Sequence, residues 1–173
     1  MTKVRTVIIP RRAGYEYEVE CAQMSDGSEP ANEYITKLRS GAWPNGYDEK
    51  VDPDSQPAHV IYLMMATLQT MAESGVPNNQ TAIKALRDGL WEVRGDTSRM
   101  AFFDVDGDGA HASKGRIGDR RDVDPDNKDD FWWFPLLDET LRLTHGFAKT
   151  GDKTEETDIE LAQLIRQEDL NND

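Results

Sequence analysis

The sequence predicts one domain of the α+β class, in which strands and helices share a core. Its 173 residues are enough for one compact domain and too few for two full ones. Two hydrophobic patterns occur along it: apolar residues at every second position, as in half-buried strands, and apolar residues three or four apart, as in helices. We therefore treat residues 1–173 as a single domain.

The first half of the chain is expected to form two strands followed by two helices. Val4–Ile9 is rich in β-branched residues and ends at a proline, which cannot donate to a sheet. Tyr15–Cys21 alternates strictly between apolar residues and glutamates, which is typical of a solvated edge strand. Ser28–Leu38 offers a capping hydroxyl and an early proline, and Ala58–Gly75 is a strongly apolar helix with a glycine stop.

A hairpin is predicted next, from Leu90–Arg94 and Arg99–Phe103 joined by a turn that contains glycine and aspartate. Because side chains alternate along a strand, Glu92 and Arg94 share one face of the sheet. Their simplest role is an ion pair across the sheet with Arg99, worth only a few tenths of a kcal/mol on a wet surface. A catalytic role is the alternative.

Residues 104–130 are expected to form an acidic insertion. They hold nine aspartates against five lysines and arginines, a net charge of −4. The opening copies a calcium-binding EF-hand loop, with Asp104, Asp106 and Asp108 at alternate positions, but position twelve is Gly115 where a bidentate glutamate is needed. A solvated loop is the favoured interpretation, and calcium binding is the alternative.

The last third begins with four consecutive aromatic residues, Phe131–Phe134, which are expected either to pack the insertion onto the body or to form an exposed docking patch. The strand Leu141–Lys149 follows. Its alternation places one set of side chains on one face (Leu141, Leu143, His145 and Phe147) and another on the opposite face (Arg142 and Thr144).

The final element is an amphipathic helix over Glu156–Gln167. Thr157–Glu160 matches a capping box, in which a hydroxyl and a carboxylate satisfy free backbone N–H groups at the start of a helix. The helix is expected to bury five apolar side chains, those of Ile159, Leu161, Ala162, Leu164 and Ile165.

Composition limits the classes of protein that the chain can belong to. A formal net charge of −13 argues against a nucleic-acid partner, because phosphate binding depends on lysine and arginine. A single cysteine, Cys21, cannot form an internal disulfide, and no apolar run approaches the length that spans a bilayer. The short apolar run near the start is followed by two arginines, so we do not expect it to act as a signal peptide. We therefore expect a cytoplasmic protein without a membrane segment.

Four blocks of the sequence nevertheless resemble one family, the RelE/HigB superfamily of toxins, and in particular its phage-derived branch. The blocks are Lys84–Arg94, Arg99–Phe103, Leu143–Thr154 and Ile159–Ala162. Their order and spacing match the family apart from the acidic insertion. The resemblance covers about residues 82–166 well and residues 4–75 in outline.

The resemblance implies a fold and an activity. The fold is a small antiparallel sheet with two N-terminal helices and a C-terminal helix. The activity is toxin-type mRNA cleavage, often on the ribosome, without a metal ion or cofactor, and it is neutralised by an antitoxin protein. A ribose 2′-OH attacks the neighbouring phosphate, which needs a base, a proton donor and cations around the phosphorane.

The same resemblance assigns site residues one at a time. Arg99 matches the arginine that opens the family's third sheet strand, and Glu92 and Arg94 match a polar pair on the preceding strand. Lys149 matches a lysine after the final strand, and His145 a position that is often histidine. Glu92 or His145 would be the base, with Arg94, Arg99 and Lys149 as cations. The expected RNA-binding side chains are those of Lys84, Arg87 and Phe147.

The chain also differs from the family, whose toxins are usually basic. Its charge is uneven, however, since residues 82–103 carry a net +1 from four basic and three acidic side chains. The acidic insertion is expected to raise solubility, or alternatively to fold over the site as an RNA mimic. Besides the nuclease, two other classes remain: an inactive protein of the same fold that binds a host or antitoxin protein, and a calcium-stabilised module.

Overall fold

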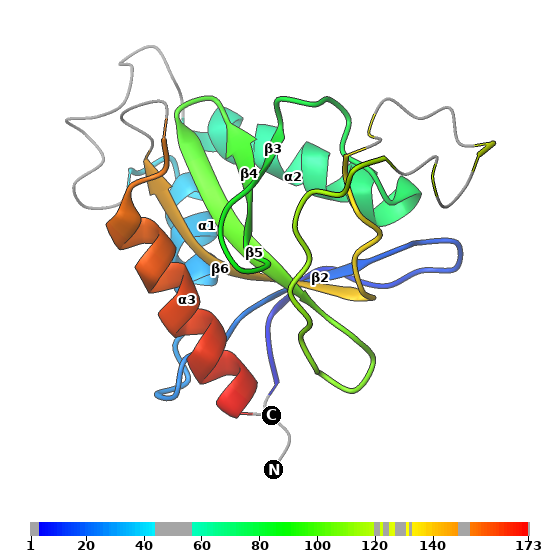
Figure 1. Ribbon diagram of the computed structural model, residues 1–173. Helices are drawn as coiled ribbons and strands as arrows, with labels where there is room; N and C mark the ends of the chain where they lie inside the picture. Colours follow the sequence, from blue (N-terminus) through cyan, green and yellow to red (C-terminus); the bar gives the residue numbers. More distant parts are fainter. Residues whose placement is uncertain are drawn as a thin grey trace.

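The computed structural model confirms an α+β fold built on one mixed sheet (Figure 1). It describes residues 4–43, 57–119, 122, 125–126, 131, 133–148 and 153–172. Within these residues, six strands lie in the order β1-β2-β6-β5-β4-β3. The strands are β1 (Val7–Ile9), β2 (Glu18–Cys21), β3 (Ile83–Ala85), β4 (Trp91–Gly95), β5 (Ser98–Val105) and β6 (Thr140–Ala148).

Helices cover both faces of the sheet (Figure 1). They are α1 (Pro30–Arg39), α2 (Pro57–Ser74) and α3 (Glu156–Asn171). The larger apolar cluster lies under α1 and α2 and includes Leu38, Leu68 and Phe102. The smaller cluster lies under α3 and includes Phe103 and Ile165. Two N-terminal helices and one C-terminal helix are therefore present as expected, and they form two layers around the sheet.

The expectation of an antiparallel sheet is wrong at one pair of strands. β2 runs parallel to β6, with Val19 opposite Leu141, whereas the other neighbouring strands are antiparallel. A parallel pair needs a long crossover connection, and here α1, α2 and three strands separate β2 from β6. β2 consequently lies between β1 and β6, so the prediction that Tyr15–Cys21 is an edge strand is also wrong.

The predicted hairpin is confirmed, with Arg94 directly opposite Arg99. Its turn consists of two residues, and the first, Asp96, has a φ of 56°, which aspartate tolerates better than most residues. Gly95 is required before the turn because a Cβ there would lie 2.6 Å from Met64 Cγ on α2. The short strand β3, which the sequence did not predict, pairs with the outer side of β4.

An irregularity in β6 changes which side chains share a face. Leu143 lies opposite Phe102 and Gly146 lies opposite Met100, so two β6 residues, Thr144 and His145, face the single intervening residue of β5. This is a β-bulge. Strict alternation placed Leu141, Leu143, His145 and Phe147 on one face, and that prediction is wrong: the two leucines belong to the cluster under α1 and α2, whereas Phe147 belongs to the cluster under α3.

The long connection between β5 and β6 differs in two ways from the predicted insertion over 104–130. β5 continues to Val105, and Asp104 is buried, so the connection begins at Asp106. The aromatic run packs onto the body: Phe131, Trp133 and Phe134 are buried. The packing interpretation is therefore confirmed for these three, while Trp132 lies outside the described residues.

Helix α3 is longer than predicted and begins differently. Its N-cap is Glu155, which makes no side-chain capping bond, so the predicted capping box is wrong. Ile159, Ala162 and Ile165 are buried as expected, but Leu161 and Leu164 remain 39% and 47% exposed. Among the described residues, no helix combines the length and the apolar character that a membrane crossing requires.

Candidate functional site

Three of the predicted site residues form a row across β4, β5 and β6, one pair of residues from the β4–β5 turn. Arg94 on β4 is the register partner of Arg99 on β5, which in turn is the partner of Phe147 on β6. Side chains at directly paired positions project from the same face. Two like charges directly opposite each other destabilise a sheet. Glu92 offsets the charge of Arg94 in part, and Arg99 Nη1 donates to the backbone carbonyls of Asp96 and Ser98, at 2.8 Å for Ser98. The two positive charges still favour an anionic ligand near this pair. We call Arg94, Arg99 and Phe147 the arginine row.

Glu92 precedes Arg94 by two residues on β4 and does not face solvent. It is fully buried, and its Oε1 lies 3.6 Å from the Nε of Arg94. Its Oε2 accepts a hydrogen bond of 2.9 Å from the hydroxyl of Thr154, just before α3. The carboxylate therefore orients the guanidinium of Arg94 and ties the start of α3 to the sheet. Because it is covered, this geometry assigns it a positioning role in place of the predicted general base.

His145 lies next to the row because of the bulge in β6. Its ring centroid is 5.1 Å from that of Phe147, and its side chain is buried. Nδ1 lies 3.3 Å from the hydroxyl of Thr144, and Nε2 lies 3.4 Å from Oδ1 of Asp158 on α3. A carboxylate next to one ring nitrogen orients the imidazole. His145 thus has the surroundings of an acid–base group.

Two of the predicted RNA-binding residues lie away from the row. Lys84 on β3 is the register partner of Glu92 on β4. It lines a separate pocket of about 260 Å³ together with Arg116 and Trp133. Arg87 is exposed, and both of its terminal nitrogens bind the carboxylate of Glu156, with Nη2 2.7 Å from Oε2. This hydrogen bond raises the pKa of Arg87 and lowers the pKa of Glu156. Arg87 therefore already has an anionic partner.

Lys149, the remaining predicted cation, follows β6 immediately but lies outside the described residues. The structure consequently brings together Arg94, Arg99 and Phe147, with Glu92 and His145 as their neighbours. Lys84 is paired with Glu92 but lines another pocket, and Arg87 binds Glu156.

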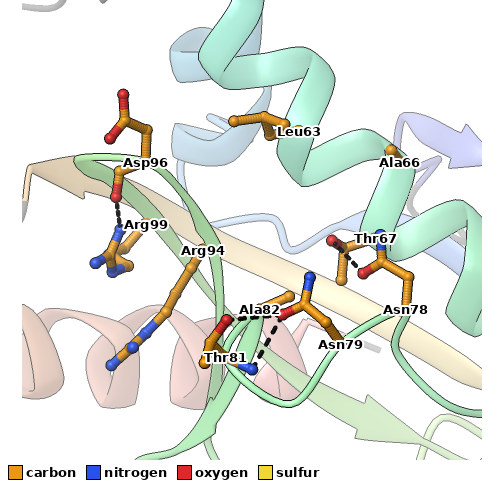
Figure 2. A pocket seen from close by; sticks show the side chains of 10 residues that line it. All are labelled: Leu63, Ala66, Thr67, Asn78, Asn79, Thr81, Ala82, Arg94, Asp96 and Arg99. Carbon is orange, nitrogen blue, oxygen red and sulfur yellow. Dashed lines mark hydrogen bonds between the residues drawn. The ribbon is translucent and has the colours of Figure 1, made fainter.

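The arginine row borders a pocket that the sequence did not predict (Figure 2). The pocket has a volume of about 350 Å³ and lies between α2, the segment before β3 and the β4–β5 turn. Arg94 and Arg99 line one side, and Asn78, Asn79 and Thr81 line the other. These three polar residues belong to a connection without hydrophobic periodicity, so no pattern in the sequence marks them. We call this the asparagine pocket.

The calcium-like motif uses its aspartates for other contacts. Asp104 Oδ2 accepts hydrogen bonds from Lys114 Nζ at 2.9 Å and from the backbone N–H of Asp138 at 2.7 Å. Asp106 Oδ1 accepts from the backbone N–H groups of Asp108 and Ala110, which lowers the pKa of its carboxyl group. Within the described part of the chain, no group of three or more His, Cys, Asp or Glu side chains is placed to hold a metal ion. The motif here is a turn closed by hydrogen bonds to Asp106.

Comparison with known proteins does not assign the chain to a family: no family model matches it, and no curated protein shows significant similarity to it. The geometry of the arginine row and the asparagine pocket is therefore the basis for a function.

Proposed function

We propose that this protein is a toxin-type endoribonuclease that cleaves mRNA by attack of a ribose 2′-OH on the adjacent phosphate, without a metal ion. The observation that supports this most directly is the arginine row. Two arginines at paired strand positions can bind a phosphate and stabilise the extra negative charge that develops on it in the transition state. Phe147, at the end of the same row, is buried in the cluster under α3, so stacking of a base on its ring would require that ring to turn outward.

His145 is the proposed acid–base group of this reaction. Its contacts with Thr144 and Asp158 hold the ring beside Phe147, at one end of the arginine row. A histidine can remove the 2′-OH proton or protonate the leaving 5′-oxygen near neutral pH. Glu92 positions Arg94, and Lys149 would add a further cation at the end of β6.

The proposal includes the biological partners that the resemblance to RelE/HigB toxins implies: mRNA, free or on the ribosome, and a neutralising antitoxin protein in the cytoplasm. The net charge of −13 opposes long-range attraction to RNA. The local charge at the row differs from the total charge, because Arg94 and Arg99 occupy paired positions on neighbouring strands. Lys84 and Arg87 do not belong to the row. We expect RNA binding to depend on the few cations of the row and, because few phosphates are neutralised, to weaken only moderately with salt.

A second candidate function is that of an inactive protein on the same fold that binds a host or antitoxin protein. The exposure of Leu161 and Leu164 on α3 favours it. Leu161 borders a pocket of about 350 Å³ that is also lined by Tyr34, Trp43 and His145. The aromatic run, which offered an alternative docking patch, has three buried members and does not form this surface.

Cleavage assays on purified protein distinguish the two candidates. We expect the wild type to cleave mRNA and to arrest growth when induced, and Arg94→Ala and Arg99→Ala each to slow cleavage by about 10²-fold or more, as for loss of one transition-state donor. Arg39→Ala removes an exposed arginine at the end of α1 and should leave the rate unchanged.

The measurements are cleavage of labelled mRNA, free and on ribosomes, with circular dichroism to verify folding. If both row variants cleave as fast as the wild type, the assignment of the site is wrong. If the wild type binds a partner protein stably and cleaves neither form of mRNA, the second candidate replaces the first.

A further inference from the structure

We infer that the asparagine pocket binds a nucleobase next to the arginine row and that it prefers the keto bases guanine and uracil over the amino bases adenine and cytosine. This deepens the proposed function, on which it rests, by naming a specificity site for the RNA substrate. The inference depends on which atoms of the pocket donate hydrogen bonds and which accept them.

The orientation of the Asn79 amide is fixed by a backbone group. The N–H of Thr81 lies 3.0 Å from the Oδ1 of Asn79, and because a backbone N–H can only donate, the atom that faces it must be the oxygen. The hydroxyl of Thr81 donates to the same oxygen at 2.8 Å. The NH₂ group of Asn79 therefore points away from this turn, toward the side of the pocket that α2 covers in Figure 2.

The other side-chain groups around the pocket also present donors. Asn78 uses its Oδ1 to accept from the hydroxyl of Thr67 at 3.1 Å, which leaves its NH₂ group for another partner. Guanidinium groups such as those of Arg94 and Arg99 have no acceptor atom. The carboxylate of Asp96, which could accept, points away from the asparagines in Figure 2. A ligand that supplies hydrogen-bond acceptors on the asparagine side of this space is therefore favoured.

Size and wall composition suit a base. The volume of about 350 Å³ lies in the range of small-molecule sites. Leu63 and Ala66 of α2 and Ala82 before β3 provide apolar contact for a ring. Ala82 lies beside Arg94, because the backbone N–H of Arg94 donates to the carbonyl of Ala82. From Arg94 the row continues to Arg99 on β5 and then to Phe147 on β6, so the two arginines lie between this pocket and Phe147 along the sheet. Because Arg94 and Arg99 line the pocket, a phosphate bound by the arginines would have an adjoining base within reach of it.

The bases differ in what they offer to donors. Guanine presents two adjacent acceptors, N7 and O6, whereas adenine presents an acceptor and an amino donor. Uracil carries a carbonyl oxygen at the position where cytosine carries an amino group. An amino group directed at the NH₂ of Asn79 would leave two donors facing each other, so we expect discrimination of at least about 5-fold, the lower end of the range for one specific base contact.

The test measures binding of single nucleotides to the full chain, which does not require catalysis. Isothermal titration calorimetry should show 5′-GMP binding at least about 5-fold more tightly than 5′-AMP, and 5′-UMP more tightly than 5′-CMP. Asn79→Asp keeps an oxygen for Thr81 but replaces the donor with an acceptor, and it should shift the GMP to AMP ratio in favour of AMP. Asn79→Ser, which removes the donor without adding charge, should bring the ratio close to one.

Asn171→Asp at the exposed end of α3 makes the same chemical change far from the pocket and should leave the ratio at its wild-type value. A wild-type ratio near one, or a ratio that Asn79→Asp and Asn79→Ser do not move, overturns the inference even if mRNA is cleaved. A keto preference that depends on Asn79 in a protein that cleaves no mRNA supports the pocket and removes the nuclease proposal instead.

Discussion

Replacing Asp169 with alanine is expected to lower the free energy of unfolding by about 3 to 5 kcal/mol, the cost of breaking a buried charge cluster from one side. Asp169 is fully buried near the end of α3. Its carboxylate accepts hydrogen bonds from Arg5 Nε at 2.7 Å, from Arg142 Nη1 at 2.8 Å and from the backbone N–H of Gln23 at 2.8 Å. Without it, two nearly buried guanidinium groups lose the anion that faces both of them.

Urea denaturation followed by circular dichroism measures this loss. Glu160→Ala is the matched control, because it removes an acid of the same helix that is exposed, and surface changes of this kind usually stay within about 0.5 kcal/mol. Equal midpoints for Asp169→Ala and Glu160→Ala would show that the cluster does not stabilise the fold.

Replacing Trp91 with alanine is expected to cost about 3 to 5 kcal/mol as well, through loss of a large buried side chain and the cavity it leaves. Trp91 is fully buried on β4. Its ring stacks on Trp133 at 6.4 Å and contacts Phe134 at 5.0 Å, and its Nε1 donates to the carbonyl of Lys114 at 3.0 Å. Trp91 therefore attaches the long β5–β6 connection to the sheet at two separate points.

Two measurements separate the contribution of Trp91 to stability from its attachment of the β5–β6 connection. Urea denaturation gives the loss of stability, with Tyr62→Ala as the control because that aromatic side chain is 68% exposed. Limited trypsin digestion reports on the connection, since release of the anchor should speed cleavage after Lys114 or Arg116. Trp91→Phe keeps a ring but removes the N–H that donates to the carbonyl of Lys114. Trypsin cleavage should therefore become faster while most of the stability remains. Unchanged digestion of both variants would contradict the anchoring role.

Local patterns in the sequence predicted the helices and the hairpin well, because each depends on residues close in the chain. The turn around Asp96 set the register that brings Arg94 opposite Arg99. The parallel pairing of β2 with β6 could not be predicted this way, since the partners lie about 120 residues apart and no local signal reports their contact. Strict alternation also failed at the bulge of Thr144 and His145, because one extra residue reverses the face of those that follow.

The site was predictable where it follows from strand register and unpredictable where it depends on tertiary contacts. Arg94, Arg99 and Phe147 were predicted and lie in one row. Arg87 was predicted as an RNA contact, but α3 places Glu156 against it. Asn79 carries no sequence signal, because its position beside the row depends on how α2 leads into β3.

The central place of β6 in the sheet has a consequence for the order in which the protein can fold during synthesis. β6 joins the pair β1-β2 to the group β5-β4-β3, and it is the last strand of the sheet to leave the ribosome. Until then the two parts expose open strand edges, which are prone to pairing with other chains. The nascent chain therefore cannot assemble the arginine row until Phe147 has emerged, so any nuclease activity would arise only near the end of translation.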